Sequence, residues 1–204
     1  AYPARPLDRG KVLSAADLQK IGKFERYRDV DGDGIPYRTL PGTSHPAASY
    51  FTRGSGHNEK ALYSEKPDDY RNNMDRLARK FDTARKLVPA PVEESEPGAE
   101  IGFIAFGTTH DALQESRDQL RNEKGLKTSY LRLRGYPFSP RVKDFITRHK
   151  HVYVVEQNRD GQMRDLLALE VGAECGRLRS IRHYTGVAID ARFVSNSILT
   201  QEGR

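Results

Sequence analysis

The chain contains a single cysteine, Cys175, among its 204 residues. One thiol cannot form an internal disulfide, hold an iron–sulfur cluster or complete a cysteine-rich zinc site. The sequence also lacks any apolar run near the roughly 18 residues that cross a bilayer, and it lacks a charged-then-apolar leader with a small-residue cleavage site. We therefore expect no membrane association, an inert thiol, and a protein of the cytoplasm.

Recognisable nucleic-acid-binding patterns are missing as well. The net charge of +6 and the pI of about 9.4 make nucleic acid a partner class to consider. However, acidic residues interrupt the basic ones, as in residues 71–86, and this alternation is typical of a solvated helix face. Because no helix-turn-helix, zinc-finger or RRM pattern accompanies the charge, we expect no nucleic-acid partner.

A change of composition divides the chain. Residues 89–100 read PAPVEESEPGAE, which is the composition of an exposed linker. Residues 1–66 are rich in Gly, Pro, Ser, Thr and Tyr, with one short helix expected at residues 14–21. Such a stretch can scarcely bury a core by itself, so we expect it to lie on the surface of a larger body.

Residues 67–88 predict a long helix. Pro67 suits the first helical position, and Asp68 and Asp69 complement the positive end of the helix dipole. Apolar side chains then recur at helical spacing: Tyr70, Met74, Leu77, Phe81, Ala84 and Leu87. We expect this stripe to pack on another domain or subunit.

After the linker, short apolar runs alternate with helical patterns. Strands are predicted at residues 101–107, 127–134, 151–156 and 177–181. Helices are predicted at residues 111–123, from the Ser139–Pro140 pair onward, at 162–171 and at 190–199. This alternation implies an α/β fold with a parallel sheet and right-handed crossovers.

The stretch DVDGDGIPY, residues 29–37, is a candidate calcium loop. An EF-hand places oxygen ligands at positions 1, 3 and 5, glycine at 6 and a bidentate glutamate at 12. The residues that match are Asp29, Asp31, Asp33 and Gly34. Position 12 is Leu40, however, and Pro36 opposes the exit helix. Asp29, Asp31 and Asp33 therefore remain candidates only for calcium binding outside the EF-hand type, and a polar turn is the alternative.

The Gly-Asp-Gly at residues 32–34 also matches the start of a thiamine-diphosphate motif, in which Asp and a downstream Asn hold Mg²⁺. That motif should follow a buried hydrophobic strand, whereas the polar segment KFERYRDV precedes this one. The context therefore argues against a diphosphate loop here.

Polar segments at loops and strand ends provide the other candidate sites. GSGHNE, residues 54–59, places His57 and Glu59 beside glycines, where they could serve as acid–base groups or ligands, or be structural. FGTTHD, residues 106–111, joins a strand to a helix, where backbone N–H groups could bind an anion, although it is neither GxGxxG nor a Walker loop. VEQNRDG (155–161) and RHYTG (182–186) also follow strands, and loop capping or subunit contacts explain them equally well.

Taken together, five segments resemble one protein family. RYRDVDGDGIPYRTLPGT (26–43), the run from YFTRGSGHNEK to ARKLVP (50–89), IGFIAFGTT (101–109), YLRLRGYPF (130–138) and VYVVEQNRDGQM (152–163) are similar to the carboxyl-terminal third of the alpha subunit of 2-oxoglutarate:ferredoxin oxidoreductases. The resemblance extends in order over residues 7–199. It identifies the 2-oxoacid:ferredoxin oxidoreductase family more specifically than it identifies 2-oxoglutarate as the substrate.

The resemblance implies an activity for the complete enzyme. Such an enzyme decarboxylates a 2-oxoacid on thiamine diphosphate with Mg²⁺, passes electrons through a [4Fe–4S] cluster to ferredoxin, and forms an acyl-CoA. Residues 101–204 would be a domain similar to the transketolase carboxyl-terminal domain. Residues 1–88 would be the end of the preceding pyrimidine-binding domain, and residues 89–100 the linker between them.

The resemblance also implies which parts lie elsewhere. The family's YPITP-like active-site segment and its thiamine-activating glutamate are not in this sequence, and the diphosphate motif and cluster cysteines belong to the beta subunit. No residue is therefore assigned as catalytic, and this chain alone is expected to bind no cofactor. Arg53, His57 and Glu59 are the residues expected near the active-site side or a subunit interface. The alternatives are a stand-alone interaction module of the transketolase-tail type without a redox role, and a calcium-dependent protein.

Overall fold

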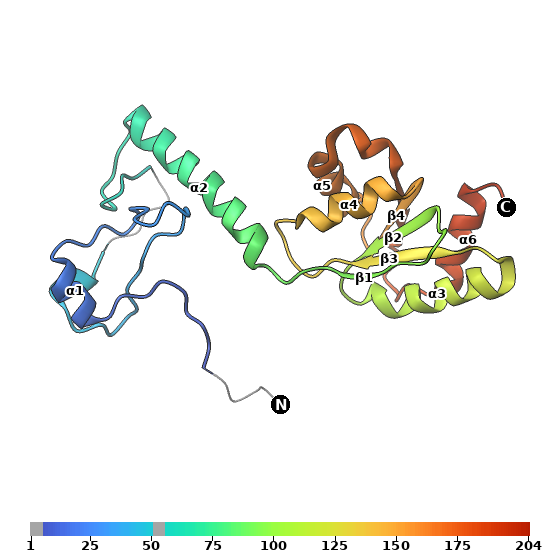
Figure 1. The fold of residues 1–204 in the computed structure, drawn as a ribbon, viewed down its shortest axis with the longest axis horizontal. Helices are drawn as coiled ribbons and strands as arrows, with labels where there is room; N and C mark the ends of the chain where they lie inside the picture. Colours follow the sequence, from blue (N-terminus) through green and yellow to red (C-terminus); the bar gives the residue numbers. More distant parts are fainter. Residues whose placement is uncertain (1–5, 51–55) are drawn as a thin grey trace. The chain divides into compact units, whose positions relative to one another are not determined.

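The computed structural model describes residues 6–50 and 56–204. It divides the chain into two compact units, Ala1–Lys86 and Leu87–Arg204 (Figure 1). Arg53, one of the predicted site residues, lies outside the described residues. Within those residues, no helix combines the length with the apolar character that crossing a membrane requires.

The second unit is a five-stranded sheet with helices on both faces. Its strands are β1 (Val92–Glu94), β2 (Ile101–Ala105), β3 (Thr128–Arg132), β4 (His151–Glu156) and β5 (Leu178–Arg182). Its helices are α3 (Thr109–Lys124), α4 (Pro140–Arg148), α5 (Gln162–Val171), the 3-10 segment Gly172–Arg177 and α6 (Ala191–Gln201). The strand order is β1-β3-β2-β4-β5, with β2 to β5 parallel and β1 antiparallel to β3. The predicted α/β class is confirmed.

The strands bury both faces, because each face carries its own helix layer. Phe103 of β2 packs with side chains of α3 and α6, whereas its neighbour Ile104 packs with side chains of α4 and α5. Since successive side chains of a strand point to opposite faces, the continuous apolar run of β2 supplies both cores at once. In Figure 1, α4 and α5 lie on one side of the sheet and α3 on the other; α6 packs with α3 in the same core cluster.

The segment predicted as a linker contains β1, which adds an edge strand to the sheet. Val92 pairs with Arg132 and Glu94 with Tyr130 of β3. Glu93 accepts a hydrogen bond from Arg148 of α4 at 2.8 Å, and Glu94 forms an ion pair with Arg117 of α3. A strand of three residues, flanked by prolines and carrying two glutamates, gives no strand pattern in the sequence. Its side chains nevertheless connect the edge of the sheet to a helix on each face.

The first unit consists mainly of loops. Its regular elements are α1 (Ala15–Ile21), a 3-10 turn (Pro46–Ala48) and α2 (Pro67–Leu87). Ser14 and Asp17 form a capping box at the start of α1, which fixes that end of the helix. Among the described residues of this unit, the buried apolar side chains are those of Leu18 and Ala61. The unit therefore has almost no hydrophobic core, and polar contacts determine its shape.

The central contact of the first unit joins the DVDGDG turn to α2. Gly34 lies so close to the helix that an added Cβ would be 2.3 Å from the backbone nitrogen of Lys80 and 2.7 Å from the carbonyl oxygen of Arg76. Thr83 of the helix donates a hydrogen bond to the carbonyl oxygen of Asp33 at 2.6 Å. The glycine is therefore required for backbone-to-backbone approach.

Substituting Gly34 with alanine tests this contact against a matched control. Gly34 and Gly32 both have positive φ, of 80° and 76°, but a Cβ on Gly32 would meet nothing within 4 Å. Both variants place an alanine at a similar positive φ, so the difference between them reports mainly the steric clash with α2. We expect Gly34→Ala to lower the free energy of unfolding by about 1–3 kcal/mol more than Gly32→Ala, measured by hydrogen exchange of the α2 amides. Equal protection in the two variants would show that the turn does not hold the helix.

A second polar cluster fixes the carboxyl-terminal helix of the α/β unit. The Glu202 carboxylate, just after α6, accepts hydrogen bonds from Tyr153 Oη and His151 Nδ1 of β4, each at 2.7 Å. Burial would raise the pKa of Glu202, but these hydrogen bonds and the charge of His151 outweigh it and hold the pKa below its ordinary value. The ionised carboxylate therefore stabilises the folded state.

The contribution of Glu202 should depend on pH. A carboxyl whose pKa is depressed by folding stabilises the native state above its unfolded pKa, near 4.5, and loses that contribution as the pH falls through the folded pKa. In urea titrations, Glu202→Gln should be less stable than the wild type at pH 7, by about 1 kcal/mol, and the difference should shrink below pH 4.5. Asp118→Asn, at an exposed position of α3, is the control and should show no such convergence.

Candidate functional site

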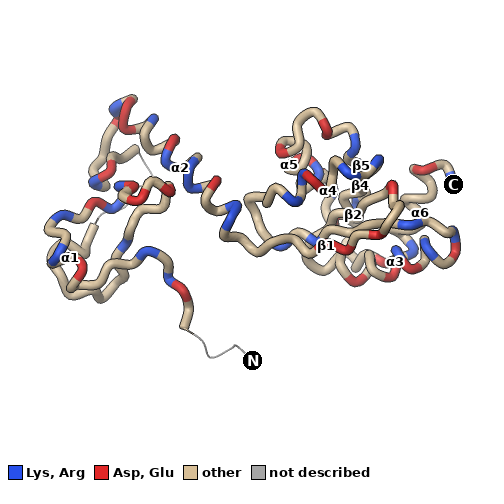
Figure 2. The backbone as a smooth tube through the Cα atoms, viewed as in Figure 1, with Lys and Arg blue, Asp and Glu red and all other residues tan. Residues whose placement is uncertain are grey.

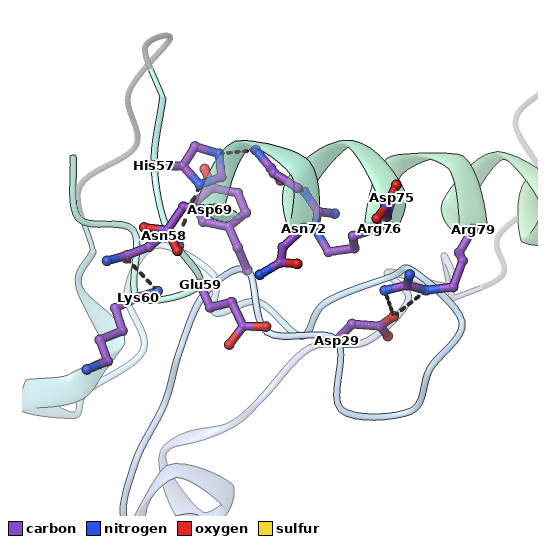
Figure 3. Close-up of a pocket in the computed structure, with 12 residues that line it drawn as sticks. Asp29, His57, Asn58, Glu59, Lys60, Asp69, Asn72, Asp75, Arg76 and Arg79 are labelled. Carbon is purple, nitrogen blue, oxygen red and sulfur yellow. Dashed lines mark hydrogen bonds and ion pairs between the residues drawn. The ribbon is translucent and has the colours of Figure 1, made fainter. Parts of the chain in front are cut away.

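A polar cavity of about 470 Å³ lies within the first unit. One wall is the polar face of α2, and the others come from residues around Tyr27 and Asp29 and from the segment 57–60 (Figure 3). The cavity contains His57 and Glu59, so the structure brings two of the three predicted site residues together. It is lined by both signs of charge: Lys60, Arg76 and Arg79 against Asp29, Glu59, Asp69 and Asp75.

His57 is held on three sides. Its ring stacks on Tyr27, with centroids 3.9 Å apart and planes inclined by 22°. Nδ1 lies 3.1 Å from the carbonyl oxygen of Asn58, and Nε2 lies 3.3 Å from the amide nitrogen of Asn73 on α2. Both ring nitrogens are therefore engaged within the chain.

The hydrogen bonds around His57 determine its proton position. Arg76 donates to Asn73 Oδ1 at 2.6 Å, so the amide nitrogen of Asn73 faces the imidazole. An amide nitrogen only donates, hence Nε2 of His57 must accept and Nδ1 must carry the proton that is donated to Asn58. In this arrangement His57 is neutral and orients the loop, and protonation of Nε2 would set two donors against each other.

Arg76 and Arg79 secure the cavity from the helix side. Arg76 is 8% exposed and also donates to the carbonyl oxygen of Gly34 at 3.3 Å. Burial first, and then the charge of Arg26, lower its pKa from the usual value, but a guanidinium stays charged at neutral pH. Arg79 pairs with Asp29 Oδ2 at 3.1 Å, and the other carboxylate oxygen of Asp29 is buried without a hydrogen-bond partner among the described residues.

The remaining candidates for calcium ligation are paired with a lysine. The ammonium of Lys11 lies 2.6 Å from Asp31 and 2.7 Å from Asp33, between the two carboxylates. Within the part of the chain that the structure describes, no group of three His, Cys, Asp or Glu side chains is placed to hold a metal ion. The turn is therefore stabilised by groups of the protein itself: Asp29 Oδ2 accepts a hydrogen bond from the backbone nitrogen of Gly34 at 3.0 Å and also pairs with Arg79.

The cavity can bind a polar group but offers little for acid–base catalysis. The Glu59 side chain is exposed, whereas the nitrogens of His57 are occupied. Asn73, Arg76 and Arg79 hold the site together and were not among the residues predicted from the sequence. The sequence feature that could have indicated them is their three-residue spacing, which places polar side chains on one face of α2 next to the apolar stripe.

The strand-end candidates of the α/β unit serve mainly to connect loops. Gln157, after β4, donates to the hydroxyl oxygens of Thr108 and Thr109, after β2, at 3.3 and 3.2 Å. Glu156 is fully buried and accepts hydrogen bonds from the backbone nitrogens of Met163 and Arg164, at the start of α5. A carboxylate of the protein thus occupies the helix terminus that could otherwise bind an anion.

Comparison with known proteins identifies the fold. No protein-family model matches the chain, and no curated protein matches it either. Among solved structures, a 2-oxoglutarate:ferredoxin oxidoreductase from Magnetococcus marinus, with 2-oxoglutarate, coenzyme A and succinyl-CoA bound, is similar over 87% of this chain at 22% identity and a TM-score of 0.73. The chain has the fold of a segment of that oxidoreductase.

The similarity to the oxidoreductase covers 30% of its chain. It confirms, at the level of fold, the resemblance that the sequence segments indicated. The alpha chain of a probable 2-oxoacid ferredoxin oxidoreductase from Thermoplasma acidophilum also aligns, over 56% of this chain and 98% of its own, at 22% identity. Its TM-score of 0.36 is too low to support an argument.

The network around His57 leads to a test with two adjacent asparagines. Asn73 and Asn72 both line the cavity on α2, but the described hydrogen bonds of His57 and Arg76 involve Asn73 and not Asn72. Asn73→Ala leaves the buried guanidinium short of an acceptor, so we expect it to destabilise the first unit by about 1–3 kcal/mol. Asn72→Ala should change stability by less than about 0.5 kcal/mol. Hydrogen exchange of α2 measures both, and equal effects would contradict the proposed network.

Proposed function

We propose that the chain is the carboxyl-terminal third of the alpha subunit of a thiamine-diphosphate-dependent 2-oxoacid:ferredoxin oxidoreductase. The complete enzyme would convert 2-oxoglutarate to succinyl-CoA in the cytoplasm and pass the electrons to ferredoxin. The observation that carries the proposal is the agreement of two comparisons: the sequence segments resemble this family in order, and the fold is similar to such an enzyme over 87% of the chain.

The segment would have an architectural role in the assembled enzyme. Residues 101–204 would form the domain similar to the transketolase carboxyl-terminal domain, and residues 1–88 would close the pyrimidine-binding domain and contact the beta subunit. Arg53, His57 and Glu59 would lie toward the active site or that interface. Both ring nitrogens of His57 form hydrogen bonds, one with Asn58 and one with Asn73. These bonds support a positioning role rather than a proton-transfer role for the histidine.

The cofactors of the proposed reaction do not fit the described residues of this chain. Asp33 of the Gly-Asp-Gly sequence is paired with Lys11, and one cysteine cannot hold a [4Fe–4S] cluster. Thiamine diphosphate, Mg²⁺ and the cluster would therefore be held with the beta subunit. This chain contributes the scaffold, and no step of the reaction is assigned to its side chains.

The proposal predicts an activity of the full-length protein with its partner. Affinity purification of the native protein should recover a second, cysteine-containing subunit. The complex should reduce a low-potential electron acceptor when 2-oxoglutarate and CoA are both present, and not when either is omitted. Parallel assays with other 2-oxoacids would give the substrate preference. A protein that purifies without a partner and decarboxylates no 2-oxoacid would instead favour the stand-alone interaction module.

The role of the His57 loop can be tested in the same complex. His57→Ala should reduce either recovery of the second subunit or the rate of acceptor reduction, because the segment 57–60, which contains Glu59, loses its contact to Asn73 of α2. Lys20→Ala, at an exposed position of α1, is the control and should affect neither. Unchanged activity and assembly in the His57 variant would exclude a functional role for this loop.

A further inference from the structure

Another cavity of the first unit, of about 510 Å³, adjoins the candidate site. The two cavities share Tyr27, His57, Asn73 and Arg76 as a common wall. The lining of the second cavity is strongly cationic: it includes Arg9, Lys11, Arg26, Arg38, Arg76 and Lys80. Among the described residues that line it, none is Asp or Glu.

Most of these cationic groups are not neutralised within the described chain. Lys11 pairs with Asp31 and Asp33 at the edge of the cavity, but no other cation of this set forms a described ion pair. Arg26 donates to the carbonyl oxygen of Tyr37 at 3.4 Å, and its Nε is buried and finds no hydrogen-bond partner among the residues that the structure describes. Arg38 likewise donates to the carbonyl oxygen of Arg9, a neutral acceptor. The cavity lining therefore carries positive charge that no described acidic side chain balances, and at least one N–H donor, Nε of Arg26, that no described acceptor uses.

Two guanidinium groups of the cavity lining lie near the same aromatic ring. Arg26 and Arg76 lie over the ring of Tyr27, at 4.9 and 5.8 Å from its centroid. After burial, the charge of Arg26 is the next cause that lowers the pKa of Arg76, as expected for two neighbouring cations. Asp29 opposes this effect, but its carboxylate is directed to Arg79 on the other side of the wall. Arg76 is buried and Arg26 is half-buried with an unused donor. A neighbouring pair of like charges of this kind is stabilised when an anion binds beside it.

We propose that this cavity binds the phosphate group of a small-molecule ligand, as a phosphate monoester or a diphosphate. A guanidinium matches the geometry of phosphate with two parallel N–H donors, and an excess of several positive charges favours a group with more than one negative charge. The volume is within the range of small-molecule sites, which is about 300–1,000 Å³. The proposal rests on the lining of the cavity alone and does not depend on the proposed enzymatic function.

Isothermal titration of the full-length protein at low salt tests the site. The probes are pyrophosphate, adenosine 3′,5′-bisphosphate, and succinate as a dicarboxylate. Pyrophosphate should bind the wild type, and Arg26→Gln and Lys80→Gln should each raise its Kd about tenfold, the effect of one charge-assisted hydrogen bond of about 1.4 kcal/mol. Arg71→Gln, which removes the same charge from an exposed position of α2 outside the cavity, should leave the Kd within about twofold.

The relative affinities of the probes show which kind of phosphate ligand the cavity prefers. Tighter binding of adenosine 3′,5′-bisphosphate than of pyrophosphate would indicate a nucleotide ligand, and the reverse order would indicate a diphosphate alone; either supports the proposal. Three results would overturn the proposal. Arg71→Gln could lose as much affinity for pyrophosphate as Arg26→Gln and Lys80→Gln, neither phosphate probe could bind, or succinate could bind as tightly as pyrophosphate. Since Lys80 is exposed, its variant gives a result even if Arg26→Gln is unstable.

Discussion

The first unit depends on one close contact, between Gly34 and the backbone of α2. Among the described residues of this unit, the buried apolar side chains are those of Leu18 and Ala61. Hydrophobic burial of so little surface cannot hold the segment together. The turn instead lies against the helix backbone, Arg76 donates to the carbonyl oxygen of Gly34, and Thr83 donates to that of Asp33. This contact sets the position of Asp29 and Arg76, and Arg76 in turn orients Asn73 and His57. The candidate site is thus a consequence of how the acidic turn meets the helix (Figure 3).

The α/β unit was largely predictable from the sequence, because its signals are local. The bounds of β4 and α5 agree with those predicted, and Pro67 begins α2 as expected. The edge strand β1 was missed because its stability comes from pairing with β3 and from ion pairs to Arg148 and Arg117, which lie far away in the chain. For the same reason, the pattern DVDGDG alone could not reveal Lys11 and Arg79 as the partners of its aspartates. Long-range polar pairing leaves no periodic trace in a sequence.

The wall shared by the two cavities separates two different electrostatic environments, one lined by both signs of charge and one lined by positive charge. On one side, Asp29, Glu59, Asp69 and Asp75 balance the basic groups; on the other, the described lining contains no acid. Arg76 takes part in both, because it lines each cavity and bonds to Asn73 and to Gly34. An anion in the cationic cavity would stabilise the charge of Arg76 and with it the hydrogen bond that orients Asn73 toward His57. An anion in one cavity would therefore affect the loop that borders the other, through the hydrogen bonds of Arg76 and Asn73.

Helix α2 presents different chemistry on neighbouring faces. Asn73, Arg76 and Thr83 hold the loops of its own unit, whereas basic and acidic residues alternate along its length (Figure 2). The apolar stripe remains open within the described residues, with Tyr70 65% and Phe81 51% exposed. Leaving large apolar side chains at helical spacing in water forgoes roughly 1.5–3 kcal/mol for each, and the hydrogen bonds that α2 makes to the described loops of this unit come from its polar side chains. The expectation that another domain or subunit covers the stripe thus stays a prediction with a clear physical motive. Among the described residues, Tyr70, Phe81 and Leu87 of the stripe are exposed, and burying them against a partner would add hydrophobic stabilisation that the polar contacts of α2 do not supply.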